Sequence, residues 1–361
     1  MPIMPKKEWH QTKPLPLIAG VADTPLRPFL ERLIGGEDLS PIEAAGFFTA
    51  LLDESAHPAQ IAGALVAMAA KGESAAELAG MADVMRKRAI RINSRQKNLV
   101  DTSGTGSSRA KTFNVSTAAA FVAAGAGVTV AKHTNRGVAT KAGSADVLEK
   151  LGVKISGEPE VAQAGLSGTG LAFLFAPKFH PALRRLGDVK RNLGIRTTLN
   201  LLGVLGNPAR APRQVVGVWH PELIKPIAQA LALLGAQHAW VVHGSDGLDE
   251  ITTAGETYVA EVAGGKIKTF RITPEEFGVK RGATTGLRIK TPAESAQIIT
   301  DVLLSKRRDE ARSLVVLNAA AAIMVAGLAK QPMQAARLAE QSIDSDSARV
   351  KLERLIQTTN K

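Results

Sequence analysis

Three short polar motifs follow apolar, β-branched stretches of this sequence, and each carries side chains suited to binding phosphate or a divalent cation. The first motif, DTSGTGSSRAKTFNVST, places Gly104 and Gly106 in a turn before Asn114, Ser116 and Thr117. Glycines let backbone N–H groups approach an anion closely, and a helix N-terminus adds partial positive charge. The motif predicts a phosphate cradle, and a tight turn followed by an ordinary helix cap is the simpler alternative.

The second motif, KHTNRGVAT, lies where a predicted strand ends and contains Lys132, His133, Asn135, Arg136 and Thr140. Ligands of open α/β sheets bind at the carboxyl ends of the strands, so these side chains are expected to face the same crevice as the glycine turn. Two cations at that place suit a polyphosphate. The alternative interpretation is a basic loop on the surface.

The third motif, HGSDGLDE, again follows an apolar strand and ends in the adjacent carboxylates of Asp249 and Glu250. Mg²⁺ prefers one or two carboxylates and shares the phosphate oxygens of a substrate. The motif predicts a magnesium site beside the phosphate cradle, with an acidic turn that binds nothing as the alternative.

Helices precede these motifs. Ser40 and Ser74 each stand before a helical pattern with a glutamate three residues later, and Gly72 ends the helix that begins at Pro58. This arrangement is the capping box, with proline at helix starts and glycine just beyond helix ends. The sequence up to about residue 97 therefore predicts a small all-helical domain, and residues 1–20 are expected to be a flexible arm.

From residue 98 strands and helices alternate, which is the pattern of an α/β domain. A hairpin is predicted around Gly264 and Gly265, and two closing helices are predicted over 313–330 and 333–357. The predicted fold class is α/β: a small all-helical N-terminal domain plus a larger α/β domain with a central, mostly parallel sheet flanked by helices.

Composition excludes several classes of protein. The 361 residues contain no cysteine, which removes disulfides, thiolate metal sites and a cysteine nucleophile. The longest apolar stretches, 118–131 and 317–329, are interrupted and shorter than the roughly 20 residues that span a bilayer. The first residues lack the apolar segment of a secretory signal, so a cytoplasmic location without membrane attachment is predicted. The net charge of +12 favours an anionic partner.

Taken in order, the motifs resemble those of the anthranilate phosphoribosyltransferase family, in the fold group of the pyrimidine nucleoside phosphorylases. The resemblance covers about residues 38–355 and includes GTG, TFNVST, KHTNR, GSADVLEKLG, FLFAPKFHPAL, LGIRTTLNLLG, NPA and HGSDGLDEIT. It implies that helices from about 178–202 join the helical domain of 21–97, that 98–177 and 203–361 form the α/β domain, and that the protein is a homodimer. It also implies pentosyl transfer from phosphoribosyl pyrophosphate to the amine of anthranilate.

The resemblance also implies which residues bind each ligand. The donor, phosphoribosyl pyrophosphate, is expected at Gly104, Ser107, Ser108, Thr112, Asn114, Ser116, Thr117, Lys132, Asn135, Arg136, Thr140 and Ser144. Anthranilate is expected at Gly104, Asn135, His180 and Lys190. Mg²⁺ is expected at Ser116, Asp249 and Glu250. No side-chain nucleophile is implied.

Two departures from the family pattern leave other functions open. Ser107 and Ser108 replace the usual Gly-Asp, and Lys190 stands where the family has an arginine that binds anthranilate. Lysine provides a point charge where arginine forms a two-pronged contact. A related enzyme with a different acceptor is therefore one alternative. A non-catalytic, nucleic-acid-binding member of the fold is another, suggested by the net charge and the basic run over 86–97, but it is not favoured.

Overall fold

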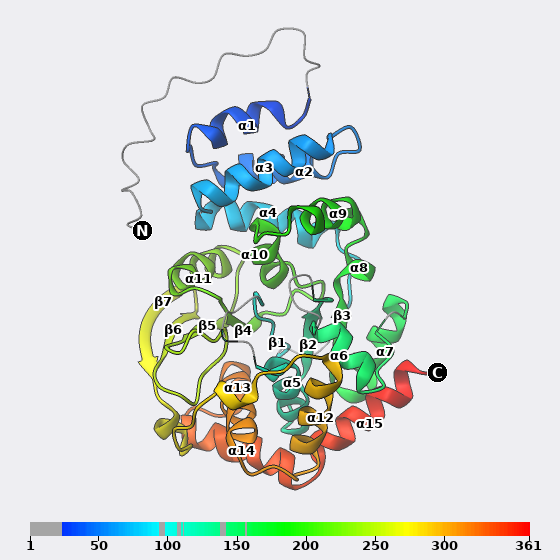
Figure 1. Ribbon diagram of the computed structural model, residues 1–361, viewed down its shortest axis with the longest axis vertical. Helices are drawn as coiled ribbons and strands as arrows, with labels where there is room; N and C mark the ends of the chain where they lie inside the picture. The colour runs from blue at the N-terminus through cyan, green and yellow to red at the C-terminus, as the bar shows by residue number, and fades with distance from the viewer. Residues whose placement is uncertain (1–23, 94–97, 107–109, 111, 138–141, 156) are drawn as a thin grey trace.

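The computed structural model describes residues 24–361 apart from 94–97, 107–109, 111, 138–141 and 156. The chain begins with four helices that pack on one another and stand apart from the sheet in Figure 1. They are α1 (Arg27–Ile34), α2 (Pro41–Leu51), α3 (Pro58–Lys71) and α4 (Ala75–Arg88).

The predicted helix caps are present. The hydroxyl of Ser40 accepts the Glu43 N–H while the Glu43 carboxylate accepts the Ser40 N–H, and Ser74 forms the same reciprocal pair with Glu77. Gly72 ends α3 with φ at +85°, a conformation that a side chain would strain. Local sequence therefore fixes where these helices begin and end.

A seven-stranded sheet forms the centre of the described α/β part, in the order β3-β2-β1-β4-β5-β6-β7. The first five strands in this order are parallel, and β6 and β7 are the antiparallel hairpin predicted around the two glycines. The strands are β1 (Val100–Asp101), β2 (Val130–Thr134), β3 (Leu171–Phe175), β4 (Arg213–Gly217), β5 (His238–Gly244), β6 (Thr257–Ala263) and β7 (Lys266–Ile272). The predicted fold class is confirmed.

The two faces of the sheet pack against different helices because side chains alternate along a strand. Along β5, Trp240 and Val242 belong to the core beneath α5 and α13, whereas Ala239 and Val241 belong to the core shared with α11 and the N-terminal helices. In Figure 1, α5, α13 and the last two helices lie on the side of the sheet away from the N-terminal helices, whereas α11 lies on the side toward them. The helices beside the sheet are α5 (Val115–Gly125), α6 (Ser144–Lys150), α7 (Pro159–Thr169), α11 (Ile224–Leu233), α12 (Pro292–Leu303), α13 (Glu310–Ala326), α14 (Pro332–Asp344) and α15 (Ser347–Thr359).

The end of the chain differs from the prediction in two places. The single helix predicted over 333–357 is wrong, because Asp346 takes a left-handed conformation with φ at +62° and separates α14 from α15. The preceding helix begins at Glu310 rather than Ser313, since Asp309 accepts the Ala311 N–H at 3.2 Å and caps it. The break lets both α14 and α15 pack against α5.

After the short helix α8 (Ala176–Phe179), two helices from the middle of the chain return to the N-terminal helices: α9 (Arg184–Leu193) and α10 (Thr198–Leu205). In Figure 1 both α9 and α10 lie near the N-terminal helices, and α10 packs on α4 while α9 packs on α3. Arg185 on α9 donates to the backbone carbonyls of Asp53 and Ala56, at 3.0 and 2.5 Å. The division of the chain at 97–98, 177–178 and 202–203 stays a prediction, and α10 itself continues to Leu205.

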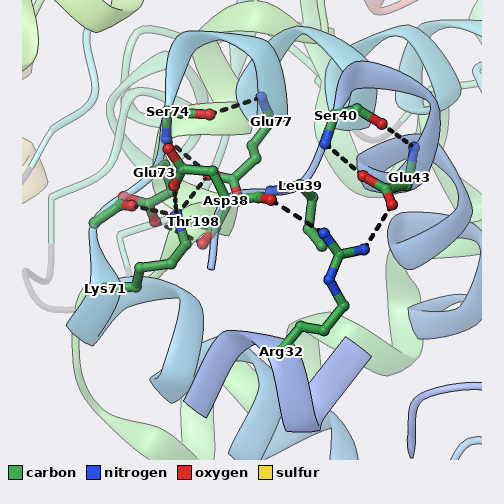
Figure 2. A network of polar contacts seen from close by, with 11 residues as sticks. Arg32, Asp38, Leu39, Ser40, Glu43, Lys71, Glu73, Ser74, Glu77 and Thr198 are labelled. Carbon is green, nitrogen blue, oxygen red and sulfur yellow. Dashed lines mark hydrogen bonds and ion pairs between the residues drawn. The ribbon is translucent and has the colours of Figure 1, made fainter. Parts of the chain in front are cut away.

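A polar network ties α10 to the turn between α3 and α4 (Figure 2). Thr198 donates its hydroxyl to Glu73 at 2.6 Å, and burial raises the pKa of Glu73. Beside it, Lys71 lies 2.6 Å from Asp38 and 2.8 Å from the buried Glu77. The bond between Thr198 and Glu73 joins segments that are more than a hundred residues apart in sequence.

Candidate active site

The three sequence motifs meet at the carboxyl edge of the parallel strands. Thr105 of the glycine turn donates its N–H to the Gly217 carbonyl at the end of β4, at 2.8 Å. A Cβ added at Gly104 would lie 3.6 Å from both the carbonyl oxygen and a carboxylate oxygen of Asp249. The glycine turn and the acidic pair, Asp249 with Glu250, are therefore in direct contact.

The acidic pair is half-buried and faces backbone donors. The Gly106 N–H donates to the Asp249 carboxylate, and the Ser116 N–H, in the first turn of α5, donates to Glu250. Burial raises the pKa of Asp249, and burial together with the neighbouring Asp249 carboxylate raises the pKa of Glu250. Two carboxylates side by side repel each other when ionised, and a cation relieves this repulsion.

Lys132 provides one positive charge at this site. Lys132 is buried in the middle of β2, and its ammonium donates to the Thr102 carbonyl at 2.9 Å. Burial lowers its pKa, while the charges of Asp101, Glu250 and Asp249 raise it. The second motif thus brings a buried cation toward the acidic pair of the third.

The residues fit a divalent cation whose coordination is completed by a substrate. Among the described residues, no group of three or more His, Asp or Glu side chains could hold a metal alone. Mg²⁺ commonly uses one or two carboxylates and takes its other ligands from water and substrate phosphates. The acidic pair, with the first turn of α5 beside it, provides that incomplete set.

The rest of the second motif is folded against α6. Arg136 forms ion pairs with Asp146 at 2.9 Å and Glu149 at 2.7 Å, so a phosphate would compete with two carboxylates for it. Ser144 accepts the Asn135 N–H at 3.3 Å. Ser144 is the first residue of α6, and Gly143 rather than Ser144 is its N-cap.

Other predicted donor residues lie at the start of α5. The side-chain oxygen of Asn114 accepts the Ser295 hydroxyl at 2.9 Å, and Thr117 has a buried hydroxyl with no partner among the described residues. Thr112 donates to the Phe113 carbonyl at 3.2 Å. The remaining predicted donor residues, Ser107, Ser108 and Thr140, lie outside the described residues.

His180, predicted for the acceptor site, lies beside His133. Their rings are 5.1 Å apart, and neither Nε2 atom has a hydrogen-bond partner in the described part of the chain. Burial lowers the pKa of both rings, that of His180 to about 3, so both are neutral at neutral pH. Because the neutral His133 ring donates its Nδ1–H to the Gly203 carbonyl at 2.6 Å, its Nε2 can accept a hydrogen bond without adding charge.

Lys190 lies in the last turns of α9 and is partly buried. No acidic side chain of the described chain lies within ion-pair distance of it, and burial lowers its pKa to about 8. Lys190 is therefore a cation without a counter-charge, and its place in the acceptor site stays a prediction.

A buried network that the motif analysis missed connects these loops. One carboxylate oxygen of Asp101 accepts the Ser103 hydroxyl at 2.5 Å and the His133 N–H at 3.3 Å. The other accepts the Asn207 side chain at 2.6 Å, just after α10. Asp101 begins the first motif, shortly before the glycine turn, and Asn207 begins the NPA motif. Their positions in these motifs were the only sequence feature that could have indicated the network.

Arg196 is a further cation that the motif analysis did not select. It precedes α10, and its guanidinium lies 5.1 Å from the centre of the Trp219 ring. Burial raises the pKa of Asp249, and the positive charge of Arg196 partly opposes that rise. Segments from the middle helices thus reach the acidic pair as well.

The basic run over 86–97 does not form one exposed face. Arg86 is buried and donates to the Leu205 carbonyl at 2.5 Å, and Lys87 pairs with Asp83 at 2.6 Å. Residues 94–97 lie outside the described part. Arg86 therefore serves the packing of α4 on α10, while Lys87, Arg88 and Arg91 are exposed.

Comparison with known proteins agrees with this geometry. Residues 96–349 match the model of the glycosyl transferase family a/b domain, and residues 27–89 match its helical bundle domain. The anthranilate phosphoribosyltransferase of Desulfosudis oleivorans is 46% identical over 330 residues, which cover 91% of this chain and 97% of that protein. That of Moorella thermoacetica is 45% identical over 92% of this chain and 97% of its own.

Solved structures agree in fold. The crystal structure of anthranilate phosphoribosyltransferase from Thermus thermophilus matches with a TM-score of 0.86 at 39% identity, covering 92% of this chain and 99% of that one. The Saccharomyces cerevisiae enzyme in complex with PRPP and Mg matches in fold with a TM-score of 0.83 at 24% identity, covering 93% and 98%. Sequence and fold together show that this chain belongs to the anthranilate phosphoribosyltransferase family, within the glycosyl transferase family that pairs a helical bundle with an α/β domain.

Proposed function

We propose that this chain transfers the phosphoribosyl group of phosphoribosyl pyrophosphate to the amine of anthranilate, a step of tryptophan biosynthesis, and that the three converged motifs carry it out. One observation supports this: the glycine turn contacts the acidic pair at one edge of the sheet, and the charges of that pair act on Lys132. Family membership supplies the reaction, and this contact supplies a site for its donor.

The reaction breaks the bond between ribose C1 and the pyrophosphate oxygen and forms a bond between C1 and the amine nitrogen. Pyrophosphate leaves with the electron pair, and the nitrogen then loses a proton. The departing charge is the main barrier, so groups placed to receive it account for most of the acceleration. No side-chain nucleophile is needed.

Asp249, Glu250 and Ser116 would hold Mg²⁺, which when bound neutralises charge on the diphosphate. Lys132 adds a fixed cation in a buried site, where its attraction for a phosphate is stronger than in water. The partial positive charge at the first turn of α5 favours phosphate oxygens beside it. These residues orient the sugar so that C1 is open to the acceptor.

On the acceptor side, we propose that the neutral pair His133 and His180 and the amide of Asn135 line the anthranilate site, and that Lys190 pairs with its carboxylate. The buried, unpartnered Nε2 atoms and the uncompensated charge of Lys190 support this. A different acceptor is the second candidate, because lysine replaces arginine there. Pyrophosphate release screened over aromatic amines and nucleobases decides between them.

The experiment for the main proposal follows the loss of anthranilate fluorescence with phosphoribosyl pyrophosphate and Mg²⁺. Wild-type protein is expected to consume anthranilate, and the double variant Asp249→Asn, Glu250→Gln is expected to lose turnover and metal-dependent donor binding. The variant Glu353→Gln, on an exposed part of α15, is the control. No consumption by the wild type at high enzyme concentration rejects anthranilate, and unchanged kinetics of the double variant reject the acidic pair.

We also propose a homodimer formed through the helical part. The exposed apolar side chains of Ile42, 85% exposed on α2, and Ile34, 62% exposed at the end of α1, support a face that a second copy covers. Sedimentation of the wild type and of Ile42→Glu measures whether the dimer forms and whether this face carries it.

A cytoplasmic location stays a prediction. No helix within the described ranges is long and apolar enough to cross a membrane.

A further inference from the structure

Asn318 is a buried amide in the middle of α13, a helix otherwise built there from alanine, valine and leucine. It is 3% exposed, and its side chain forms hydrogen bonds with the backbone of Ile251, in the loop after β5. Its oxygen accepts the Ile251 N–H at 3.0 Å, and its nitrogen donates to the Ile251 carbonyl at 2.9 Å and to the Leu314 carbonyl at 2.9 Å. All of its donor capacity is therefore used.

A polar group in such a core costs free energy unless it is hydrogen-bonded. Asn318 satisfies this requirement largely through the backbone of one residue, Ile251, which directly follows Glu250. A hydrophobic residue of similar size could not hold both polar groups of that residue. The amide is thus suited to fixing the position of a backbone segment.

The backbone of the acidic pair also approaches Gly217 of β4 closely. A Cβ added there would lie 1.7 Å from the Asp249 carbonyl oxygen, so the backbone of the pair presses on the strand itself. Further along, the Thr252 N–H donates to the Thr257 hydroxyl at 3.1 Å. The segment from Asp249 to Ile251 is therefore bonded to Asn318 of α13 and packed against Gly217 of β4, and both contacts restrict its movement.

Confinement matters because the two carboxylates repel each other. Asp249 and Glu250 are adjacent in sequence, and like charges held close together repel each other. A backbone free to move would separate the two side chains, and a cation that needs both would bind more weakly. Pre-organised ligands avoid this loss.

We propose that Asn318 is a positioning residue that holds the backbone after Glu250 so that Asp249 and Glu250 stay together for the complex of a divalent cation with the diphosphate donor. This inference rests on the proposed function of the acidic pair. Asn318 itself touches neither substrate nor metal.

The test compares Asn318→Ala and Asn318→Leu with the wild type. Leucine keeps the side-chain volume and removes the hydrogen bonds, so it separates packing from positioning. Calorimetric titration of phosphoribosyl pyrophosphate in the presence and absence of Mg²⁺ measures donor binding, and initial rates give the Mg²⁺ activation constant and kcat. Ser342→Ala is the matched control, because Ser342 is also buried and bonds to the Val122 carbonyl at 2.7 Å, away from the site.

Both Asn318 variants are expected to weaken Mg²⁺-dependent donor binding and raise the Mg²⁺ activation constant about tenfold, the effect of about one lost hydrogen bond or somewhat more. Donor binding without Mg²⁺ and kcat at saturating Mg²⁺ are expected to change less than about threefold, since only positioning is lost. A purely structural role would lower the melting temperature and kcat and leave the activation constant unchanged.

A wild-type activation constant in Asn318→Leu overturns the inference, as does an equal rise in Ser342→Ala. If the wild type binds no donor with Mg²⁺, the proposed function fails first and the role of Asn318 fails with it. Normal binding by the wild type together with normal binding by both Asn318 variants rejects Asn318 alone. The two failures are therefore distinct.

Discussion

Replacing Lys190 tests how this chain recognises the acceptor carboxylate. The ammonium is partly buried, lacks an acidic partner within the described structure, and has its pKa lowered to about 8 by burial. An arginine at this position would stay charged at every pH at which the enzyme works. The native lysine is therefore expected to make acceptor binding depend on pH, and Lys190→Arg is expected to remove that dependence.

The size of the effect follows from the pKa. At about pH 7 roughly nine tenths of Lys190 is charged, and at about pH 9 roughly one tenth is, by the titration of a single group. The sign is that of a lowered lysine pKa: the charged form is present below about 8 and is lost as pH rises through it. If only the charged form binds a carboxylate, kcat/KM for anthranilate falls about tenfold per pH unit above about pH 8.

The assay measures kcat/KM for anthranilate between about pH 6.5 and about pH 9.5, with donor and Mg²⁺ saturating so that titration of the acidic pair does not contribute. Wild type, Lys190→Arg and Lys190→Met are compared. Lys190→Met is expected to bind anthranilate weakly at all pH values, because it keeps much of the side-chain length and loses the charge. Lys190→Arg is expected to bind anthranilate more tightly and with a flat profile.

A flat wild-type profile would refute the reasoning, since the only titrating cation assigned to the acceptor would then have no part in binding. Equal profiles for wild type and Lys190→Arg with the same fall above about pH 8 would assign the titration to another group. A wild-type affinity retained in Lys190→Met would remove Lys190 from the acceptor site.

Gly217→Ala is expected to abolish donor binding in calorimetric titration, because the new Cβ would lie 1.7 Å from the Asp249 carbonyl oxygen. Gly168→Ala is the control, because nothing lies within 4 Å of a Cβ added there. Normal donor binding by Gly217→Ala would show that the backbone of the acidic pair can shift. Thr198→Val is expected to lower the free energy of unfolding by about 1–3 kcal/mol, because it leaves the largely buried Glu73 without its 2.6 Å hydrogen bond. Urea denaturation measures this, and an unchanged midpoint would mean that the link between α10 and the turn after α3 contributes nothing to stability.

Local sequence determined the helix boundaries of the N-terminal part and the family. Ser40 with Glu43 and Ser74 with Glu77 predict their capping boxes because each box is closed within four residues. The two glycines of the hairpin predict their turn for the same reason. The break at Asp346 was missed because leucine and alanine continue on both sides, and only packing of α14 and α15 on α5 requires it.

The chemistry of the site divides in the same way. The residue types and spacing in the three motifs predicted a cradle, a basic loop and an acidic pair, because parallel strands bring the loops that follow them to one edge. The roles of Asp101, Asn207 and Asn318 could not be predicted from the motifs, since each bonds to backbone or side chains 32 to 106 residues away. The states of Lys190 and His180 likewise depend on burial. Sequence by itself determined which groups are present, whereas tertiary structure decided their charge and their fixed positions, because desolvation and long-range hydrogen bonds exist only in the folded chain.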